Sequence, residues 1–118
     1  MSGETSLGSA VQLAELITRL AGTIDARADS HAETSYTAEL LQDGPLKCGQ
    51  KIAEEGVELA LALVAQGQAE AAAEAADLLY HILVGLRVKG VSLDQVADVL
   101  AERQGVSGLT EKANRTTT

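Results

Sequence analysis

The sequence predicts an all-α protein, a helical bundle built on a long antiparallel helix hairpin. Apolar residues recur at intervals of three and four over most of the chain, which is the spacing of one helix face. The alternation of apolar and polar residues that would indicate a strand never persists. Hydrophobic residues make up 46% of the chain but include no Phe or Trp, so the core must be aliphatic, which suits packed helices. A chain of 118 residues is expected to form one domain.

The first helix is expected over about 10–28, with Ser9 placed to cap its start. Its apolar residues follow the helical period: Leu13, Leu16, Ile17, Leu20 and Ile24. A polar break follows. A short second helix is then expected over 35–41, before the turn at Gly44 and Pro45.

Two longer helices are expected to form the hairpin. The first begins just after Pro45 and runs to about Ala65, where the sequence Gln-Gly-Gln interrupts it. The second spans about 69–88, and Gly90 closes it. Each contains a segment that is apolar on every side, and helices of that kind are buried. The uncharged segments are shorter than the roughly 20 residues of a membrane span, so no membrane partner is expected.

A last helix is expected to start at Ser92 and end near Arg103. Ser92 and Gln95 have the spacing of a capping box. The apolar residues of this helix predict its buried side: Val96, Val99 and Leu100. The remaining residues, 104–118, are rich in Gly, Ser and Thr and predict a flexible C-terminal tail.

Charge and cysteine content exclude several classes of protein. The formal net charge of −8, without clustered Lys and Arg or aromatic platforms, argues against a nucleic-acid partner. The single cysteine, Cys48, cannot form an internal disulfide, and no basic region followed by a long apolar run begins the sequence. We therefore expect a cytoplasmic protein. Cys48 is interpreted as a packing residue rather than a nucleophile, because no paired base accompanies it.

Acidic residues gather on one face of each hairpin helix. At about 100° per residue, an arc of about 100° on the first hairpin helix contains Lys47, Lys51, Glu54, Glu55 and Glu58. An arc of about 60° on the second contains Glu70, Glu74, Asp77 and His81. Such stripes are ordinarily solvated, but these lead directly into segments that are apolar on every side. We therefore expect the acids at the rim of the bundle or inside it.

Carboxylates gathered in a bundle require a positive charge among them, because they repel one another. Lys51 can neutralise one of them. No Cys or His converges with the others, so the sequence predicts a hard divalent cation, Mg²⁺ or Mn²⁺. A di-iron site would need Glu-x-x-His pairs, but Leu78 stands three residues before His81. A Mg²⁺ site made only of oxygen ligands suits a phosphate substrate.

The acidic motifs resemble those of a known superfamily. The pattern EExxE over 54–58, then 15 residues, then ExxD over 74–77 resembles the signature of the MazG-like all-α nucleoside-triphosphate pyrophosphohydrolases. Further segments are similar to one branch, the phosphoribosyl-ATP pyrophosphatases of histidine biosynthesis: SYTA over 35–38, AADLLYH over 75–81 and GVSL over 90–93. Where that branch often has Gly, this chain has Ala53. The resemblance covers 13–103, so residues 1–103 are expected to be the pyrophosphatase domain.

The resemblance implies Mg²⁺-dependent hydrolysis of phosphoribosyl-ATP to phosphoribosyl-AMP and pyrophosphate, the second step of histidine biosynthesis. It implies four metal ligands: Glu55, Glu58, Glu74 and Asp77. Glu54 is then the acid nearest the attacking water and a candidate general base. Lys51 is expected either to meet phosphate oxygens or to form a salt bridge with Glu55.

Three further residues are candidates for substrate binding: Tyr36, Thr37 and His81. The alternative for Tyr36 is an ordinary core position, and the alternative for His81 is a hydrogen bond to Asp77. Glu70 is expected to be solvated, near the hairpin turn, and His31 to be exposed in a polar loop.

Two other functions stay open at this point. One is a housecleaning nucleoside-triphosphate pyrophosphohydrolase of the same superfamily, and the other is a non-catalytic helical dimerisation module whose acids are surface charge. A homodimer is expected in each case. Helices that are apolar on every side need covering, and a second copy of the chain would complete the bundle.

Overall fold

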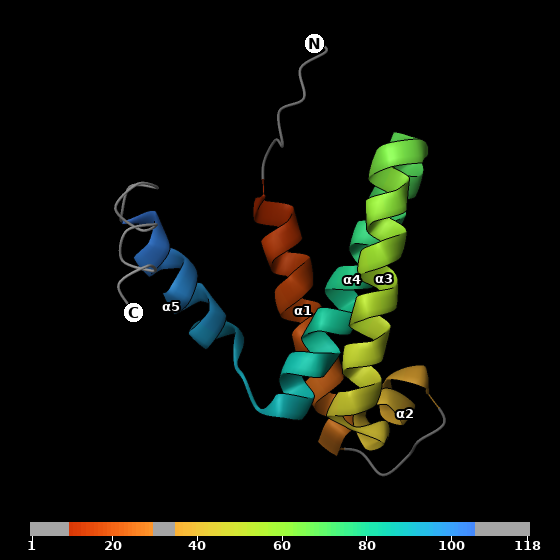
Figure 1. The fold of residues 1–118 in the computed structure, drawn as a ribbon. Helices are drawn as coiled ribbons and strands as arrows, with labels where there is room; N and C mark the ends of the chain where they lie inside the picture. The colour runs from red at the N-terminus through yellow and green to blue at the C-terminus, as the bar shows by residue number, and fades with distance from the viewer. Residues whose placement is uncertain (1–9, 30–34, 106–118) are drawn as a thin grey trace, which may run out of the picture.

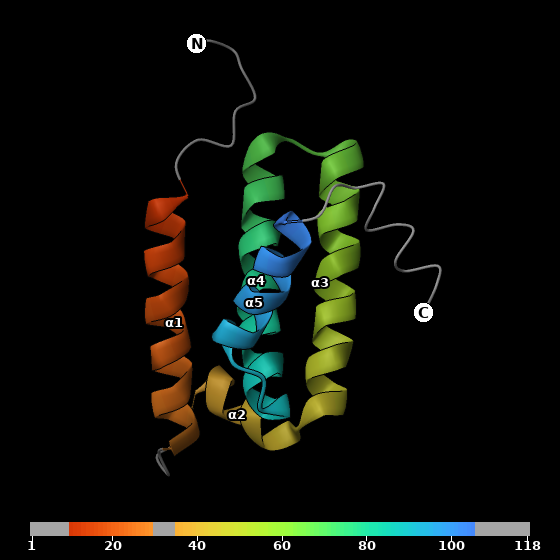
Figure 2. The same ribbon diagram turned by 90° about the vertical axis from the view of Figure 1, so that its left-hand side faces the viewer.

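A computed structural model of the protein describes residues 10–29 and 35–105. These residues form only helices: α1 (Val11–Asp29), α2 (Tyr36–Asp43), α3 (Pro45–Ala65), α4 (Gln68–Lys89) and α5 (Leu93–Gln104). Helices α3 and α4 lie antiparallel and form the predicted hairpin (Figure 2). Helix α1 packs on α4, and the short α2 lies across the open end of the hairpin (Figure 1). The all-α class and the hairpin are confirmed.

Local signals set the helix ends close to where the sequence places them. The Ser35 hydroxyl accepts a hydrogen bond from the Ala38 amide, at 3.0 Å, and so caps α2. Helix α4 ends at Gly90, whose φ of 83° lies in the left-handed region. Ser92 and Gln95 form the predicted capping box of α5, with hydrogen bonds of 2.8 and 3.1 Å. Helix α5 takes in Gln104, the first residue of the predicted tail, and Ser9 and residues 106–118 lie outside the described part of the chain.

The core lies where α1, α2, α3 and α4 meet. Its buried cluster consists of Ile24, Leu40, Cys48, Leu83 and Val84. The Cys48 thiol donates a hydrogen bond to the Leu40 carbonyl, with sulfur and oxygen 3.6 Å apart. Burial raises the pKa of the Cys48 thiol, which keeps it protonated at neutral pH. The interpretation of Cys48 as a packing residue is confirmed.

Close contact between the hairpin helices depends on a glycine. A Cβ placed on Gly85 of α4 would lie 3.2 Å from the Ile52 Cδ1 atom and 3.7 Å from the Cys48 Cβ atom of α3. The absence of a side chain at position 85 therefore lets α3 and α4 approach each other at the core.

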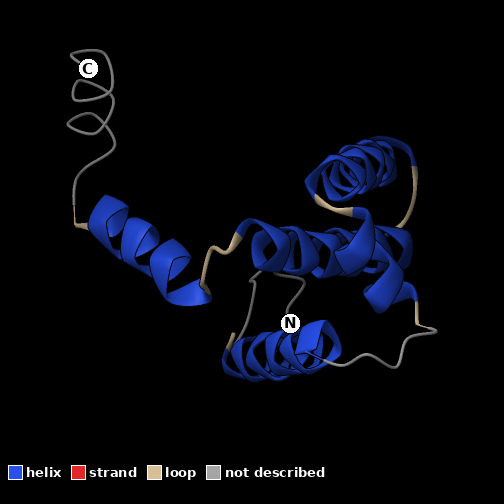
Figure 3. Ribbon diagram, turned by 90° about the horizontal axis from the view of Figure 1, so that it is seen from below, coloured by secondary structure: helices blue, strands red, loops and turns tan. Residues whose placement is uncertain are grey.

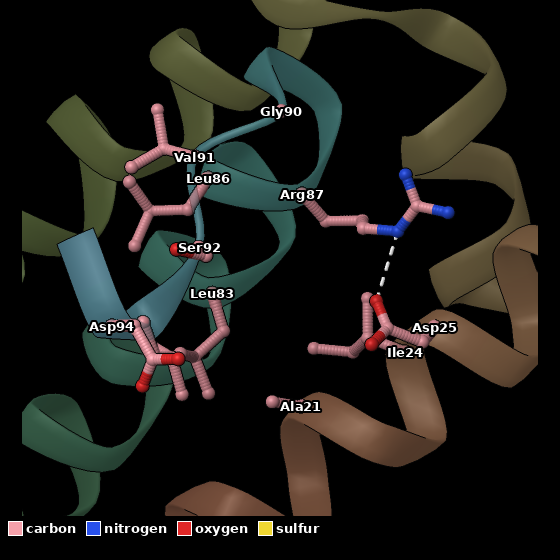
Figure 4. A pocket seen from close by; sticks show the side chains of 11 residues that line it. Ala21, Ile24, Asp25, Leu83, Leu86, Arg87, Gly90, Val91, Ser92 and Asp94 are labelled. Carbon is pink, nitrogen blue, oxygen red and sulfur yellow. Dashed lines mark hydrogen bonds and ion pairs between the residues drawn. The ribbon is translucent and has the colours of Figure 1, made fainter. Parts of the chain in front are cut away.

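Helix α5 extends away from the other four helices (Figure 3). A groove of about 360 Å³ therefore separates α1 from the end of α4 and the start of α5 (Figure 4). Apolar side chains line much of the groove: Ala21, Ile24, Leu83, Leu86, Val91 and Leu93. At its edge Arg87 donates a hydrogen bond of 2.9 Å to Asp25, which ties α4 to α1 (Figure 4).

Several apolar residues that the sequence predicts to be buried are exposed in the single chain. On α5, Val99 is 49% and Leu100 59% exposed, because no other described helix covers the apolar side of α5. Leu13 and Leu16 of α1 are also exposed. On α3, Val64 is 87% exposed, because α4 is the only one of the described helices that packs against this end of α3. The prediction that Val99 and Leu100 lie on a buried side of this last helix is wrong for one chain taken alone, and covering of these faces by a second copy stays a prediction.

No described helix combines the length and the apolar character that crossing a bilayer would need.

Candidate active site

The hairpin brings together three acidic side chains, Glu55 and Glu58 from α3 and Glu74 from α4. One carboxylate oxygen from each lies within 4.8 Å of those of the other two. Positions 55 and 58 share a face of α3 because they are three residues apart, and the antiparallel course of α4 places Glu74 opposite them. The acidic stripes of the two helices therefore face one another.

Two oxygens of this carboxylate cluster are buried without a partner. Among the described residues, neither Glu55 Oε2 nor Glu74 Oε1 has a hydrogen-bond donor. Loss of solvent raises the pKa of Glu74, and the charges of Glu58, Glu55 and Asp77 raise that pKa further. Buried, unpartnered carboxylate oxygens are costly unless a cation meets them. The all-oxygen donor set therefore fits a hard divalent cation.

Asp77 lies beside the cluster rather than in it. Its side chain is exposed, and its carboxylate is not among the oxygens grouped within 4.8 Å. It is near enough for its charge to raise the pKa of Glu74. Its backbone carbonyl accepts a hydrogen bond of 2.8 Å from His81 Nδ1.

Both carboxylate oxygens of Glu54 are held by neighbours on α3. Glu54 Oε2 accepts a hydrogen bond of 3.1 Å from Gln50, and Glu54 Oε1 lies 3.2 Å from the Lys51 ammonium group. The Gln50 hydrogen bond and then Lys51 lower the pKa of Glu54, so this acid is ionised at neutral pH. Lys51 therefore pairs with Glu54 and not with Glu55, the partner considered from the sequence. Gln50 was not a candidate, although its spacing of four from Glu54 is that of neighbours on one helix face.

Two side-chain contacts join α2 to α4. The Tyr36 hydroxyl oxygen lies 2.9 Å from His81 Nε2, and Thr37 Oγ1 forms a hydrogen bond with the Tyr80 hydroxyl. Tyr36 is 49% exposed, so it is not a core residue. Partial burial raises the pKa of Tyr36, and the positive charge of Lys51 opposes that rise. The hydrogen bond between Thr37 and Tyr80 was not predicted, because the two residues lie in different helices.

Glu70 is exposed at the start of α4, as predicted. Its carboxylate accepts a hydrogen bond of 3.1 Å from the Gly67 amide, so it caps the helix. His31 lies outside the described residues.

Known proteins are similar in sequence to this chain over most of its length. A family model described as phosphoribosyl-ATP pyrophosphohydrolase matches residues 17–104. The phosphoribosyl-ATP pyrophosphatase of Caulobacter vibrioides (strain NA1000 / CB15N) is 50% identical over 104 residues, which cover 88% of this chain and 96% of the relative. The protein of that name from Ruegeria sp. (strain TM1040) is 49% identical over 100 residues, 85% of this chain and 95% of the relative. The resemblance drawn from the motifs is confirmed: the chain belongs to the phosphoribosyl-ATP pyrophosphohydrolase family.

Proposed function

We propose that this chain hydrolyses phosphoribosyl-ATP to phosphoribosyl-AMP and pyrophosphate, the second step of histidine biosynthesis, in the cytoplasm. Its family and the names of its relatives support this reaction. The observation that carries the proposal is the convergence of Glu55, Glu58 and Glu74, with buried oxygens that have no donor among the described residues. A module without catalytic function would gain nothing from burying oxygens of Glu55 and Glu74 without a donor.

The proposed cofactor is Mg²⁺, with Mn²⁺ as a substitute. Glu55, Glu58 and Glu74 would hold it, and Asp77, which is exposed beside them, would be the fourth ligand after its side chain turns inward. When bound, the cation would neutralise these carboxylates and polarise phosphoryl oxygens of the substrate.

The remaining proposed roles belong to residues of α3 next to the carboxylate cluster and to residues of α2. In the proposed reaction, the oxygen of water forms a bond to the α-phosphorus, and the bond from that phosphorus to the bridging oxygen breaks to release pyrophosphate. Glu54 is ionised and is the proposed acceptor of the proton from water. Lys51 is the proposed partner of the phosphate oxygens, because its ammonium group is already on this face, paired with Glu54. Tyr36 and Thr37 would border the substrate from α2.

The proposed functional unit is a homodimer. Exposed apolar residues of α1 and α5 flank the apolar groove beside α4, and a second copy of the chain would cover them together. Light scattering at micromolar concentration should give twice the monomer mass. A monomer mass together with a cooperative thermal transition would refute the dimer.

Substrate preference tests the function. Pyrophosphate release from phosphoribosyl-ATP is expected to exceed release from every member of a panel of standard and non-standard nucleoside triphosphates, compared by kcat/KM. A preference for a member of the panel would point to the housecleaning enzyme instead. No release from any nucleotide, with Mg²⁺ or Mn²⁺ present, would leave only the dimerisation module.

A further inference from the structure

The hydrogen bonds of His81 determine the direction in which the Tyr36 hydroxyl donates its proton. His81 Nδ1 lies 2.8 Å from the backbone carbonyl of Asp77, which has no proton to give. Nδ1 must therefore be the donor, and in a neutral imidazole Nε2 then carries the lone pair. Because Tyr36 Oη lies 2.9 Å from Nε2, the phenol donates its only proton to His81 when that ring is neutral.

The surroundings hold this arrangement in place. His81 is 6% exposed, and its ring makes edge contacts with both tyrosine rings, with centroids 5.0 Å from Tyr80 and 5.8 Å from Tyr36. The Tyr36 and Tyr80 rings stack with centroids 6.2 Å apart. The Tyr80 hydroxyl has its own partner, Thr37. The imidazole is thus buried with both nitrogens used by the protein, whereas Tyr36 is half exposed and is joined through His81 to Asp77, next to the carboxylate cluster.

We propose that His81 is neutral with its proton on Nδ1, that Tyr36 therefore presents its phenolic oxygen to the nucleotide as a hydrogen-bond acceptor, and that His81 is the positioning residue that fixes this polarity. The inference rests on the proposed function, because it assumes that a nucleotide binds at this face. With its proton given to His81, the Tyr36 hydroxyl cannot donate to a phosphate oxygen. It accepts from a donor group of the substrate, a ribosyl hydroxyl or a base amino group. Tyr36 therefore contributes to recognition of the nucleoside part, and Lys51 to recognition of the phosphates.

The two products separate these roles, because pyrophosphate offers no sugar hydroxyl or amino group. Tyr36→Phe should raise the inhibition constant of phosphoribosyl-AMP about three- to tenfold, the loss that corresponds to one neutral hydrogen bond. The inhibition constant of pyrophosphate should change less than about twofold. Lys51→Ala should show the opposite pattern. Tyr80→Phe is the matched control: it removes one hydroxyl from the neighbouring ring, and neither constant should change more than about twofold.

Variants of His81 test the positioning role. In His81→Gln the longer amide can place an acceptor oxygen where Nε2 stood, and in His81→Asn the shorter amide can reach only the Asp77 carbonyl. His81→Gln should therefore keep the affinity for phosphoribosyl-AMP within about threefold, while His81→Asn should weaken it as Tyr36→Phe does. The double variant of His81→Asn with Tyr36→Phe should lose no more than Tyr36→Phe alone, because both changes remove the same contact.

Nitrogen-15 NMR of the phosphoribosyl-AMP complex shows which ring nitrogen of His81 carries the proton. The His81 signals are assigned as those absent from the spectrum of His81→Gln. The expected result is a neutral ring with the proton on Nδ1. Two results would overturn the inference: a proton on Nε2, or a Tyr36→Phe variant in which the binding of pyrophosphate is weakened as much as the binding of phosphoribosyl-AMP. Wild-type pyrophosphate release is measured in parallel, so an inactive wild type indicates failure of the proposed function, and an active wild type with these results indicates failure of the inference alone.

Discussion

The carboxylates of Glu55 on α3 and Glu74 on α4 face each other, and each has a buried oxygen without a donor among the residues described. Two like charges in this position favour the cation-bound or protonated state over the free, ionised one. The stability of the protein should therefore depend on pH and on divalent cations.

Glu74→Gln should stabilise the cation-free protein, and more so at high pH. The pKa of Glu74 is raised by loss of solvent and by neighbouring acids, so ionisation costs more in the folded than in the unfolded chain. Stability is therefore lost as pH rises from the ordinary glutamate pKa through the raised one. Thermal melts in EDTA should show a melting temperature several degrees above wild type at pH 8 and little difference near pH 4. Asp77→Asn, at an exposed position, should raise the melting temperature less at pH 8. An equal rise of the melting temperature by Glu74→Gln at both pH values would contradict the explanation.

Mg²⁺ and Mn²⁺ should raise the melting temperature, because the unfolded chain cannot gather Glu55, Glu58 and Glu74. At a concentration of cation 100 times its Kd, the gain should be about 2.7 kcal/mol. Glu55→Gln should abolish most of the shift. Glu70→Gln removes an exposed acid at the start of the same hairpin helix as Glu74 and should leave the shift unchanged. If neither cation moves the transition, with or without product, the proposed site is wrong.

Glu54→Gln and Glu58→Gln should differ in their response to Mg²⁺. Glu54 lies outside the carboxylate cluster, paired with Gln50 and Lys51, whereas Glu58 is part of it. Loss of a positioned base should lower kcat by roughly 10²- to 10⁴-fold and leave the Mg²⁺ dependence nearly intact in Glu54→Gln. Glu58→Gln should lower kcat and weaken the response to Mg²⁺. Steady-state kinetics across a Mg²⁺ titration decide the matter, and an equal loss of metal affinity in both variants would make Glu54 another ligand.

Gly85→Ala should lower stability, although alanine is the better helix former. The added Cβ would approach Ile52 Cδ1 to 3.2 Å in the close contact of α3 with α4. Gly49→Ala is the matched control: it is also within a helix, a Cβ there meets nothing within 4 Å, and it should gain up to about 1 kcal/mol. Ile52→Val removes the Cδ1 atom, so it should reduce the cost of Gly85→Ala when the two are combined. Urea unfolding of the four variants gives the coupling, and additive effects would show that the contact is not the cause.

The sequence was sufficient for whatever depends on neighbours along one helix. Gly90 and the Ser92–Gln95 pair act within a single turn, so their types and spacing predicted the end of α4 and the start of α5. The facing of Glu55 and Glu74 also followed from helical periodicity, once the turn between the two long helices made them antiparallel.

Other features depend on packing that periodicity does not encode. Lys51 could reach Glu54 or Glu55, and the choice of Glu54 depends on side-chain rotamers. Tyr36 and His81 are 45 residues apart, and only the position of α2 against α4 brings them together. The exposure of Val99 was also unpredictable from its own helix, because a pattern of apolar residues shows which face needs covering but not whether the same chain covers it.

His81 lies one turn after Asp77 on α4 and donates a hydrogen bond to its carbonyl, so the proposed cation-binding and nucleotide-binding residues of this helix occupy successive turns. The distance between them is thus fixed by the rise per residue of α4. One residue inserted between positions 74 and 81 would turn one end by about 100° relative to the other. Residues added at the turn between α3 and α4, or after Gly90, would leave this register unchanged. If the proposed site is correct, we expect homologous chains to vary in length at the tip of the hairpin and beyond α4, but not within the segment between Glu74 and His81.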